Sequence, residues 1–376
     1  MTAAPSGPAE VEAVGRRALR ERIDAWRALC GRAREPNAFA APEFLVPALE
    51  RLDGAGAVET LFIWEDRSRG RLVGVAALAL PRSRFGAARL WQSEQAGLAA
   101  LCLAHDGALG ALSGLLAWLK PRSALLRLPC LDPGGPTAGA LGELARRDGL
   151  AMRIANPRRR AALHASAQES FEAQLSKKRA KEWARLRRRL AERGGLAYRA
   201  GGGASDVADF LALEAKGWKG RRGTALGAAP NLRAFTGEMV EGFLARGAAE
   251  VHRLDLDGKP AAIGVVLRAR DRAFFWKTAY EESLAEFSPG VLLTLEMSRA
   301  LERDARVAMT DSCAIADHPM IDAIWPARIA LADFAIATRP GQEARLALAA
   351  ARAAASIRLR EAAKRLLHPL IGAKRS

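Results

Sequence analysis

Cysteine is scarce in this chain of 376 residues, and its placement excludes two kinds of site. The four cysteines lie far apart in the sequence and form neither a CxxC motif nor a close Cys/His pair. A zinc site or a disulfide framework needs clustered cysteines. We therefore expect no bound metal and interpret the cysteines as small buried residues.

Long apolar runs are also absent from the sequence. No run reaches the roughly 18 residues that a membrane-spanning helix needs. The best candidate, 98–119, is interrupted by His105 and Asp106. The N-terminal segment lacks the apolar core that marks a secretory signal peptide. These features predict a cytoplasmic protein.

Acidic residues are outnumbered by basic ones, 41 to 58, but the resulting charge of +17 is concentrated in two segments. Residues 176–193 and 339–376 each contain nine basic and two acidic residues, and hence each carry +7. The rest of the chain is nearly neutral, which argues against a protein coated in basic charge. With 50% hydrophobic and 26% charged residues, the chain has the composition of a globular protein.

One order of predicted elements occurs twice along the chain: three strands, a helix and a further strand. In the first half these elements are expected at residues 58–64, 72–80, 87–91, 107–120 and 124–128. In the second half they are expected at residues 250–256, 260–269, 272–278, 288–303 and 307–311. The sequence therefore predicts an α/β fold of the α+β kind, with mixed-sheet halves at residues 1–165 and 166–338 and a basic tail at 339–376.

Both basic segments are predicted to be helical. Four apolar side chains fall on one helical stripe of the first segment: Leu175, Trp183, Leu186 and Leu190. Three interpretations of this helix at 176–193 remain open: a solvated helix that joins the halves, a surface for an anionic partner, or a helix that docks on a membrane. The tail at 341–376 is richer in leucine and is the better candidate for peripheral contact with anionic lipid at the inner face of the membrane.

A Ser288-Pro289-Gly290 turn precedes the predicted helix of the second half. Serine suits a helix cap, proline suits the first helical position, and Gly290 would let a ligand approach the backbone closely. The free N–H groups and the dipole at a helix start attract an anion such as a pyrophosphate. The alternative interpretation is a well-capped helix without a ligand.

Four motifs follow one another between residues 176 and 293: SKKRAKEWARLRRRLAERG, LALEAKGWKGRRGTAL, DLDGKPAAIGVVLRARDRAFFWKTAYEE and FSPGVLL. Asp311 then ends the next predicted strand. With these features in this order, residues 50–335 resemble the GNAT acetyltransferases. Within this superfamily the sequence resembles the branch called CelD-like or BioF2-like, which is related in architecture to the FemAB peptidyltransferases. The sequence departs from the Q/R-x-x-G-x-G/A phosphate motif of the superfamily. Of the residues in that motif, only one glycine has a counterpart here, which is Gly290.

The resemblance implies two GNAT-like halves and a reaction in the second of them. An acyl group would pass directly from acetyl-CoA or another acyl-CoA to an amine or hydroxyl of a small-molecule, glycan or peptide acceptor. The pyrophosphate would bind to the backbone of four residues: Ser288, Gly290, Val291 and Leu292. Donors near the acyl carbonyl would come from Asp311 and Ser312, and Tyr280 or His318 would carry the proton.

The acceptor pocket is predicted around Trp218, Lys219 and Lys277, because an indole face beside an ammonium group suits sugars or anionic groups. Each of these assignments has a structural alternative. The same residues are also compatible with purely structural roles. These roles are a tyrosine at a strand end, a loop histidine, an aspartate that caps a turn, and a core tryptophan beside a surface lysine. Strand alternation predicts that Lys277 points away from its neighbours Trp276 and Thr278.

Two alternative functions remain open at this point. In the first, the chain is an aminoacyl transferase like the FemAB relatives, which use an aminoacyl-tRNA as donor, and its basic helix contacts tRNA. Outside this alternative, no nucleic-acid partner is expected. In the second alternative, the chain is a catalytically degenerate GNAT scaffold in a polysaccharide-assembly system. The missing phosphate motif favours this alternative.

Overall fold

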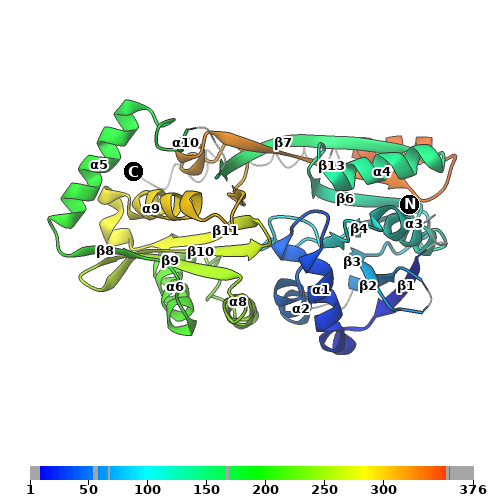
Figure 1. Cartoon of the computed structure of the whole chain (residues 1–376), viewed down its shortest axis with the longest axis horizontal. Helices are drawn as coiled ribbons and strands as arrows, with labels where there is room; N and C mark the ends of the chain where they lie inside the picture. The colour runs from blue at the N-terminus through cyan, green and yellow to red at the C-terminus, as the bar shows by residue number, and fades with distance from the viewer. Residues whose placement is uncertain (1–8, 54–57, 67, 166–168, 353–354, 356–376) are drawn as a thin grey trace.

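The computed structural model describes residues 9–53, 58–66, 68–165, 169–352 and 355. Their strands form one mixed sheet, which runs through the whole molecule (Figure 1). The strands of the first half are β1 (Glu10–Val14), β2 (Val58–Trp64), β3 (Leu72–Ala79), β4 (Ala87–Leu90), β5 (Leu101–Leu103) and β6 (Leu125–Leu131). The strands β4 and β6 are parallel to each other. The other pairs, including the pair of β5 with β3, are antiparallel.

The second half repeats this pattern. Its strands are β8 (Leu196–Arg199), β9 (Ala249–Leu256), β10 (Lys259–Ala269), β11 (Arg272–Tyr280) and β12 (Met309–Asp311). They lie in that order, antiparallel except for the parallel pair β11 and β12. The Asp257-Gly258 turn between β9 and β10 requires positive φ at both residues, which aspartate and glycine tolerate. The predicted fold class is confirmed. The predicted elements recur in the expected order, with β5 as an additional strand before the helix of the first half.

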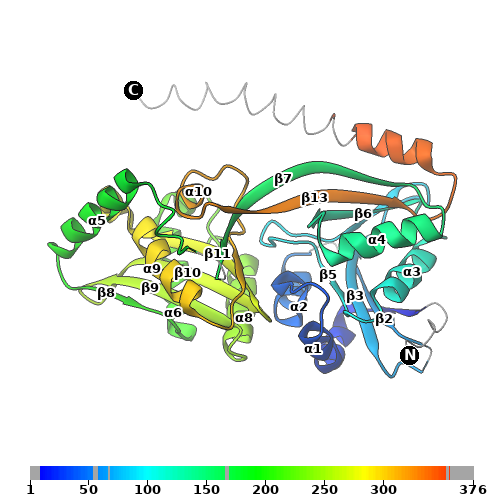
Figure 2. The same ribbon diagram turned by 45° about the horizontal axis from the view of Figure 1, so that its top comes forward.

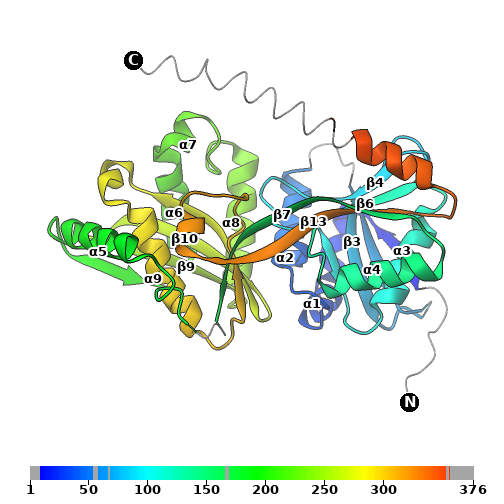
Figure 3. The ribbon, with the colours of Figure 1, turned by 90° about the horizontal axis from the view of Figure 1, so that it is seen from above.

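Two long strands, β7 (Met152–His164) and β13 (Ala327–Ala337), join the halves into one sheet. β13 comes from the end of the second half but lies between β6 of the first half and β7. β7 pairs with β13 along most of its length and with β12 through its last residues. Both strands run from one half to the other in Figures 1 to 3. The sheet is therefore built by strands that the halves share.

Helices cover both faces of the sheet in the second half (Figure 1). One face carries α6 (Ala204–Lys216), α7 (Trp218–Arg221) and α8 (Pro230–Leu244). The other face carries α5 (Lys177–Ala191), η3 (Glu282–Phe287), α9 (Pro289–Arg303) and α10 (Ile321–Ile324). The predicted basic helix is thus present as α5. It rests on the protein through Leu186 and Leu190, which are buried, while its basic side chains are mostly exposed.

The first half contributes helices that reach across to the second. Its helices are η1 (Arg16–Arg22), α1 (Ile23–Gly31), η2 (Ala38–Ala40), α2 (Pro42–Arg51), α3 (Ala108–Leu119) and α4 (Pro136–Arg147). Phe39 packs edge-on against Phe274 of β11, with ring centroids 5.3 Å apart, and Phe44 packs in the same way against Phe235 of α8. These aromatic side chains belong to one hydrophobic core that is built from both halves.

Of the basic C-terminal tail, residues 339–352 and 355 are described, and 343–352 are helical. Leu346 is buried against Leu125 and Ala337, which holds the first turns of this helix on the sheet. The rest of the tail predicted to contact a membrane lies outside the described residues. Within the described part of the chain, none of the helices has both the length and the apolar character needed to span a bilayer.

Candidate donor and acceptor site

The turn at Ser288 joins η3 to the start of α9, a largely buried helix. Ser288 has φ 50° and ψ 53°, a left-handed conformation, and its side chain makes no capping hydrogen bond. The predicted capping by this hydroxyl is therefore wrong. The Ser288 carbonyl accepts the first hydrogen bonds of the helix, from the N–H groups of Val291 at 2.9 Å and Leu292 at 3.2 Å. Pro289 occupies the first turn as predicted.

Gly290 lies in the first turn of α9 and is buried. A Cβ atom built on it would meet Tyr280 at 3.6 Å, an ordinary van der Waals distance, and nothing closer. Packing within the described protein therefore does not require glycine at this position. Tyr280 is the last residue of β11, so the predicted donor turn and one predicted proton carrier lie against each other.

β11 extends well past its parallel partner. The two strands pair from Arg272 with Met309 to Phe274 with Asp311, where β12 ends. β11 continues to Tyr280, and residues 275–280 have no partner strand on this side among the described strands. The backbone edge of β11 is therefore open beside the N-terminus of α9, where an extended ligand can pair with it.

Asp311 is fully buried at the end of β12. One carboxylate oxygen binds Arg160 of β7, and the other accepts the N–H of Cys313 at 2.9 Å. Arg160 also donates to the carbonyl of Gly97, at 3.0 Å. Burial alone would lower the pKa of Arg160, but the charge of Asp311 raises it above its ordinary value. Asp311 thus holds three segments together, and the adjacent Ser312 is buried and accepts the Ala314 N–H at 3.3 Å.

A β-bulge sits in β11 where it faces the first half. Val265 of β10 pairs with Lys277 and Val266 pairs with Phe275, so Trp276 is the extra residue. Trp276 packs into the core on the α6 side, and Lys277 lies opposite Val265 of that same core. The expectation that Lys277 points away from Trp276 is therefore wrong, because the bulge interrupts the alternation. Burial lowers the pKa of Lys277, and the nearby Lys219 adds to this shift.

Trp218 and Lys219 lie on α7, at the C-terminal end of α6. Trp218 is 43% exposed, whereas Lys219 forms an ion pair of 2.6 Å with Glu214, whose side chain is buried. The other Glu214 oxygen accepts the N–H of Leu226 at 2.7 Å. Trp218, Lys219 and Tyr280 line one small cavity of about 30 Å³. The structure therefore brings three of the predicted site residues together.

Two carboxylates of this region were not predicted from the sequence. Glu214 holds Lys219, and Glu282 of η3 accepts the backbone N–H of Trp218 and pairs with Arg221 at 2.7 Å. Both residues stand inside quoted motifs, Glu214 in LALEAKGWKGRRGTAL and Glu282 at the end of DLDGKPAAIGVVLRARDRAFFWKTAYEE. The motifs do not give their partners, which lie five residues away in one case and more than sixty in the other. They fix the position of α7 relative to the end of β11.

His318 lies in the loop between β12 and α10. Its Nδ1 accepts the N–H of Ile321 at 3.5 Å, and its carbonyl accepts the N–H of Asp322 at 3.1 Å. Its hydrogen bonds within the described residues thus serve the start of α10. They do not link it to Tyr280 or Asp311.

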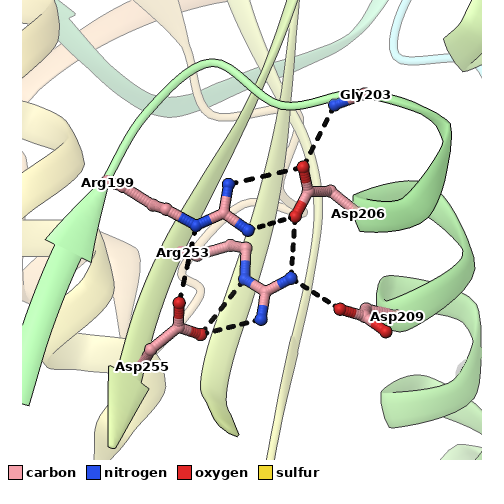
Figure 4. Close-up of polar contacts among 6 residues, drawn as sticks. All are labelled: Arg199, Gly203, Asp206, Asp209, Arg253 and Asp255. Carbon is pink, nitrogen blue, oxygen red and sulfur yellow. Dashed lines mark hydrogen bonds and ion pairs between the residues drawn. The ribbon is translucent and has the colours of Figure 1, made fainter. Parts of the chain in front are cut away.

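A cluster of two arginines and three aspartates fixes α6 on the sheet (Figure 4). Arg253 of β9 is buried and binds Asp206 at 2.7 Å, Asp209 at 2.6 Å and Asp255 at 2.9 Å. Arg199 of β8 adds a second guanidinium to Asp206 and Asp255, and Asp206 also accepts the N–H of Gly203 at the start of α6. The cluster anchors the N-terminal end of the helix that carries Glu214.

Comparisons with known proteins agree with this architecture. Residues 177–317 match the family described as the GNAT acetyltransferase domain. No curated protein matches the chain. One similar solved structure is the C-terminal DUF2156 domain of a protein described as a lysylphosphatidylglycerol synthetase from Agrobacterium fabrum. It is 14% identical, with 89% of this chain and 96% of that chain covered and a TM-score of 0.55.

Two further solved structures resemble the chain at the same level. FemX is 12% identical, with 87% of this chain and 96% of that chain covered and a TM-score of 0.54. A conserved protein of unknown function from Bacteroides thetaiotaomicron is 10% identical, with 87% and 98% covered and a TM-score of 0.56. At these identities the likeness shows the fold alone, and it extends over both halves, whereas the match to the GNAT domain covers residues 177–317. The CelD-like or BioF2-like branch stays a prediction.

Proposed function

We propose that this chain is a GNAT-type acyltransferase that moves an acyl group from a CoA thioester to an amine or hydroxyl of its acceptor. The observation that carries the proposal is the open edge of β11 beside the α9 turn, within the stretch that matches the GNAT acetyltransferase domain. Proteins with this domain generally use acyl-CoA. The donor's pyrophosphate would lie at the turn formed by Ser288, Gly290, Val291 and Leu292, next to Tyr280. The N–H groups of Ser288, Val291 and Leu292 already donate to backbone carbonyls, so among the described residues of this turn it is the Gly290 N–H that would face the pyrophosphate.

In the proposed reaction the acceptor nitrogen or oxygen attacks the thioester carbonyl, the carbon–sulfur bond breaks, and the acceptor proton ends on the CoA sulfur. Tyr280 is the proposed proton carrier, because it touches the donor turn and also lines the cavity with Trp218 and Lys219. His318, whose hydrogen bonds serve α10, is the less favoured candidate. Asp311 acts as a positioning residue, since both of its oxygens are occupied by protein donors.

A thermal shift experiment tests donor binding. Acetyl-CoA or a longer acyl-CoA should raise the melting temperature of the wild-type protein, and Gly290→Leu should remove the shift by filling the approach to the backbone. Gly237→Leu is the matched control, because Gly237 lies in helix α8 and an added Cβ atom there meets nothing within 4 Å. The absence of a shift with every CoA thioester, in folded protein, would contradict the proposal and favour a noncatalytic scaffold.

A second candidate is a FemAB-like aminoacyl transferase, and the exposed charge of α5 favours it. Within the described residues, five exposed cations of the helix have no carboxylate partner: Lys177, Lys178, Arg179, Lys181 and Arg188. Binding of tRNA through these groups would release counterions, so the affinity should fall steeply with salt, with a log–log slope of about −0.7 to −0.9 for each phosphate contacted.

The salt dependence of tRNA binding separates the two candidates. Replacing three lysines of α5 together should flatten the slope and weaken binding: Lys177→Ala, Lys178→Ala and Lys181→Ala. The matched control replaces three exposed cations of the first half: Arg82→Ala, Arg84→Ala and Arg89→Ala. Absent tRNA binding, or binding that salt does not weaken, would remove this candidate.

A further inference from the structure

Two cysteines that are far apart in the sequence lie side by side in the fold. Cys30 of α1 and Cys102 of β5 are separated by 72 residues, and their sulfur atoms are 4.0 Å apart. Cys102 is 3% exposed, whereas Cys30 is half-buried. We call this pair the dithiol. The spacing of the cysteines along the sequence does not reveal it, because the folded chain creates the contact.

Backbone pairing holds the two thiols close together. The residues that follow α1 run antiparallel to those at the end of β5, with a β-bridge between Ala33 and Ala104. The Arg34 N–H donates to the Leu103 carbonyl at 2.6 Å. Arg270, from the turn between β10 and β11, donates to the Ala33 carbonyl at 2.6 Å. The dithiol therefore lies where the first half meets the second.

A cavity of about 170 Å³ between the halves reaches both thiols. Residues of α1, β5, α8 and β10 contribute to its wall. A molecule of hydrogen peroxide is little larger than a water molecule, which needs roughly 10 to 15 Å³ of such space. The cavity therefore gives a small oxidant access to Cys30, the more exposed of the two thiols, and leaves room for the sulfur atoms to move.

We propose that Cys30 and Cys102 form an oxidative modification site, a peroxide-sensitive dithiol that closes into a disulfide and braces the joint between the two halves. This site lies outside the residues assigned to acyl transfer, and it does not depend on that reaction. The sulfur atoms approach from 4.0 Å to the bonded distance of about 2.05 Å, which the adjoining cavity accommodates.

The oxidation proceeds in two steps. In the first, the Cys30 thiolate attacks one oxygen of the peroxide, the O–O bond breaks, and Cys30 becomes a sulfenic acid while the other oxygen leaves as water. In the second, the Cys102 sulfur attacks the Cys30 sulfur, the S–O bond breaks, and the Cys102 proton leaves with the oxygen as a second water. The two thiols thus give up two electrons and two protons, which reduce one peroxide to two waters.

The rate of the first step should depend on pH, because the thiolate is the reacting form. The hydrogen bond with Cys102 and burial raise the pKa of the Cys30 thiol above its ordinary value. Glu43 of α2 adds to this shift, and Arg246, which follows α8, opposes it. Arg27, Arg268 and Arg270 also line the cavity. The thiolate fraction, and with it the rate of crosslinking, should therefore increase about tenfold per pH unit between pH 7 and 9. A rate that does not change with pH would overturn attack by the Cys30 thiolate.

Peptide mapping of the full chain tests the bond directly. The reduced protein is treated with hydrogen peroxide, alkylated, and digested with trypsin in the absence of a reductant. The expected product is peptide 28–32 joined to peptide 90–122, about 2 Da lighter than the two together, and dithiothreitol should separate them. A sulfinic or sulfonic acid at Cys30 beside a free Cys102 would overturn the proposal, and so would a link from either thiol to another cysteine.

Single variants separate this bond from other oxidation. Cys30→Ser and Cys102→Ser should each remove the crosslink. Cys130→Ser is the matched control and should keep it, because Cys130 is also half-buried and its sulfur contacts Arg158 and Gln92. Mapping of the wild type gives the answer even where a variant fails to fold.

The bracing role is tested by the melting temperature of the crosslinked protein. Because the bond closes a loop of about 70 residues in the unfolded chain, it should raise the melting temperature by about 2 to 5 °C. Dithiothreitol should reverse the increase, and Cys102→Ser treated with peroxide should not show it. An unchanged or lower melting temperature in fully crosslinked wild type would overturn the bracing role.

Discussion

Asp206→Asn should destabilise the protein, and the loss should depend on pH. The side chain of Asp206 is 6% exposed and receives hydrogen bonds from Arg199, Arg253 and the Gly203 N–H (Figure 4). Burial by itself would raise the pKa of this carboxyl, but the three donors outweigh it and lower the pKa from its ordinary 3.8 to about 2. Asparagine keeps the shape of the protonated acid and lacks the charge.

The magnitude follows from the pKa difference between the unfolded and folded chain. A shift from 3.8 to about 2 corresponds to roughly 2 to 2.5 kcal/mol of stability that the charged form contributes. Because the folded pKa is the lower one, this contribution is complete above about pH 5 and is lost as the pH falls through 3.8 towards 2. Asp206→Asn should therefore lower the free energy of unfolding by that amount at pH 7 and converge with the wild type near pH 2.

Urea unfolding followed by tryptophan fluorescence at several pH values between 7 and 2 measures this difference. Asp24→Asn is the control, because the Asp24 side chain is 99% exposed and its contact with Arg27 is 3.5 Å; its unfolding midpoint should match the wild type throughout. A gap between Asp206→Asn and the wild type that stays constant from pH 7 to 2 would refute the electrostatic reasoning.

Two further stability changes follow from buried contacts, and the donor test with Gly290→Leu is described above. Arg160→Met should lower the free energy of unfolding by about 3 to 5 kcal/mol in urea titrations, because it leaves the fully buried Asp311 without its cation; a loss below about 1 kcal/mol would contradict the pairing. Phe39→Ala should cost about 3 to 5 kcal/mol in calorimetry and keep a single transition, since Phe39 joins a core built from both halves. Two separated transitions in the wild type would show that the halves do not share that core.

Much of the second half could be predicted from the sequence because its signals are local. Alternation, the Asp257-Gly258 turn and Pro289 at a helix start place β9, β10, β11 and α9 within a few residues of their observed bounds. The narrow apolar stripe of α5 likewise matches Leu186 and Leu190, which are buried. Each of these features is decided by neighbours in sequence.

The shared strands β7 and β13 could not be predicted, because their pairing is decided by distant residues. β7 contains Pro157 and four arginines, and within it only 160–163 are buried, so its own pattern reads as a polar segment. Arg160 is tolerated there since Asp311, from the other half, neutralises it. The division into residues 1–165 and 166–338 reflects the repeated element order, whereas the sheet is completed by exchange of strands between those segments.

The candidate site shows the same limit. Trp218 and Lys219 line one cavity with Tyr280, but their partners Glu214 and Glu282 are set by contacts of the folded chain that the motifs around these residues do not reveal. The direction of Lys277 relative to Trp276 was mispredicted because one extra residue in β11 interrupts the alternation between them, and a bulge is defined by the partner strand.

Tyr280 has a position that gives the proposed reaction its geometry. On the α9 side, the Tyr280 ring lies 3.6 Å from the point where a Cβ atom at Gly290 would be. On the α6 side, Tyr280 lines the cavity together with Lys219. The proposed donor turn and the cavity beside Trp218 and Lys219 lie on opposite faces of the sheet, so in the proposed reaction donor and acceptor meet where the sheet is incomplete. Past Phe274, β11 has no partner strand on its β12 side among the described residues, which makes this edge the place of meeting. Two ligands that approach from opposite faces do not compete for one entrance, and each should therefore bind in the absence of the other.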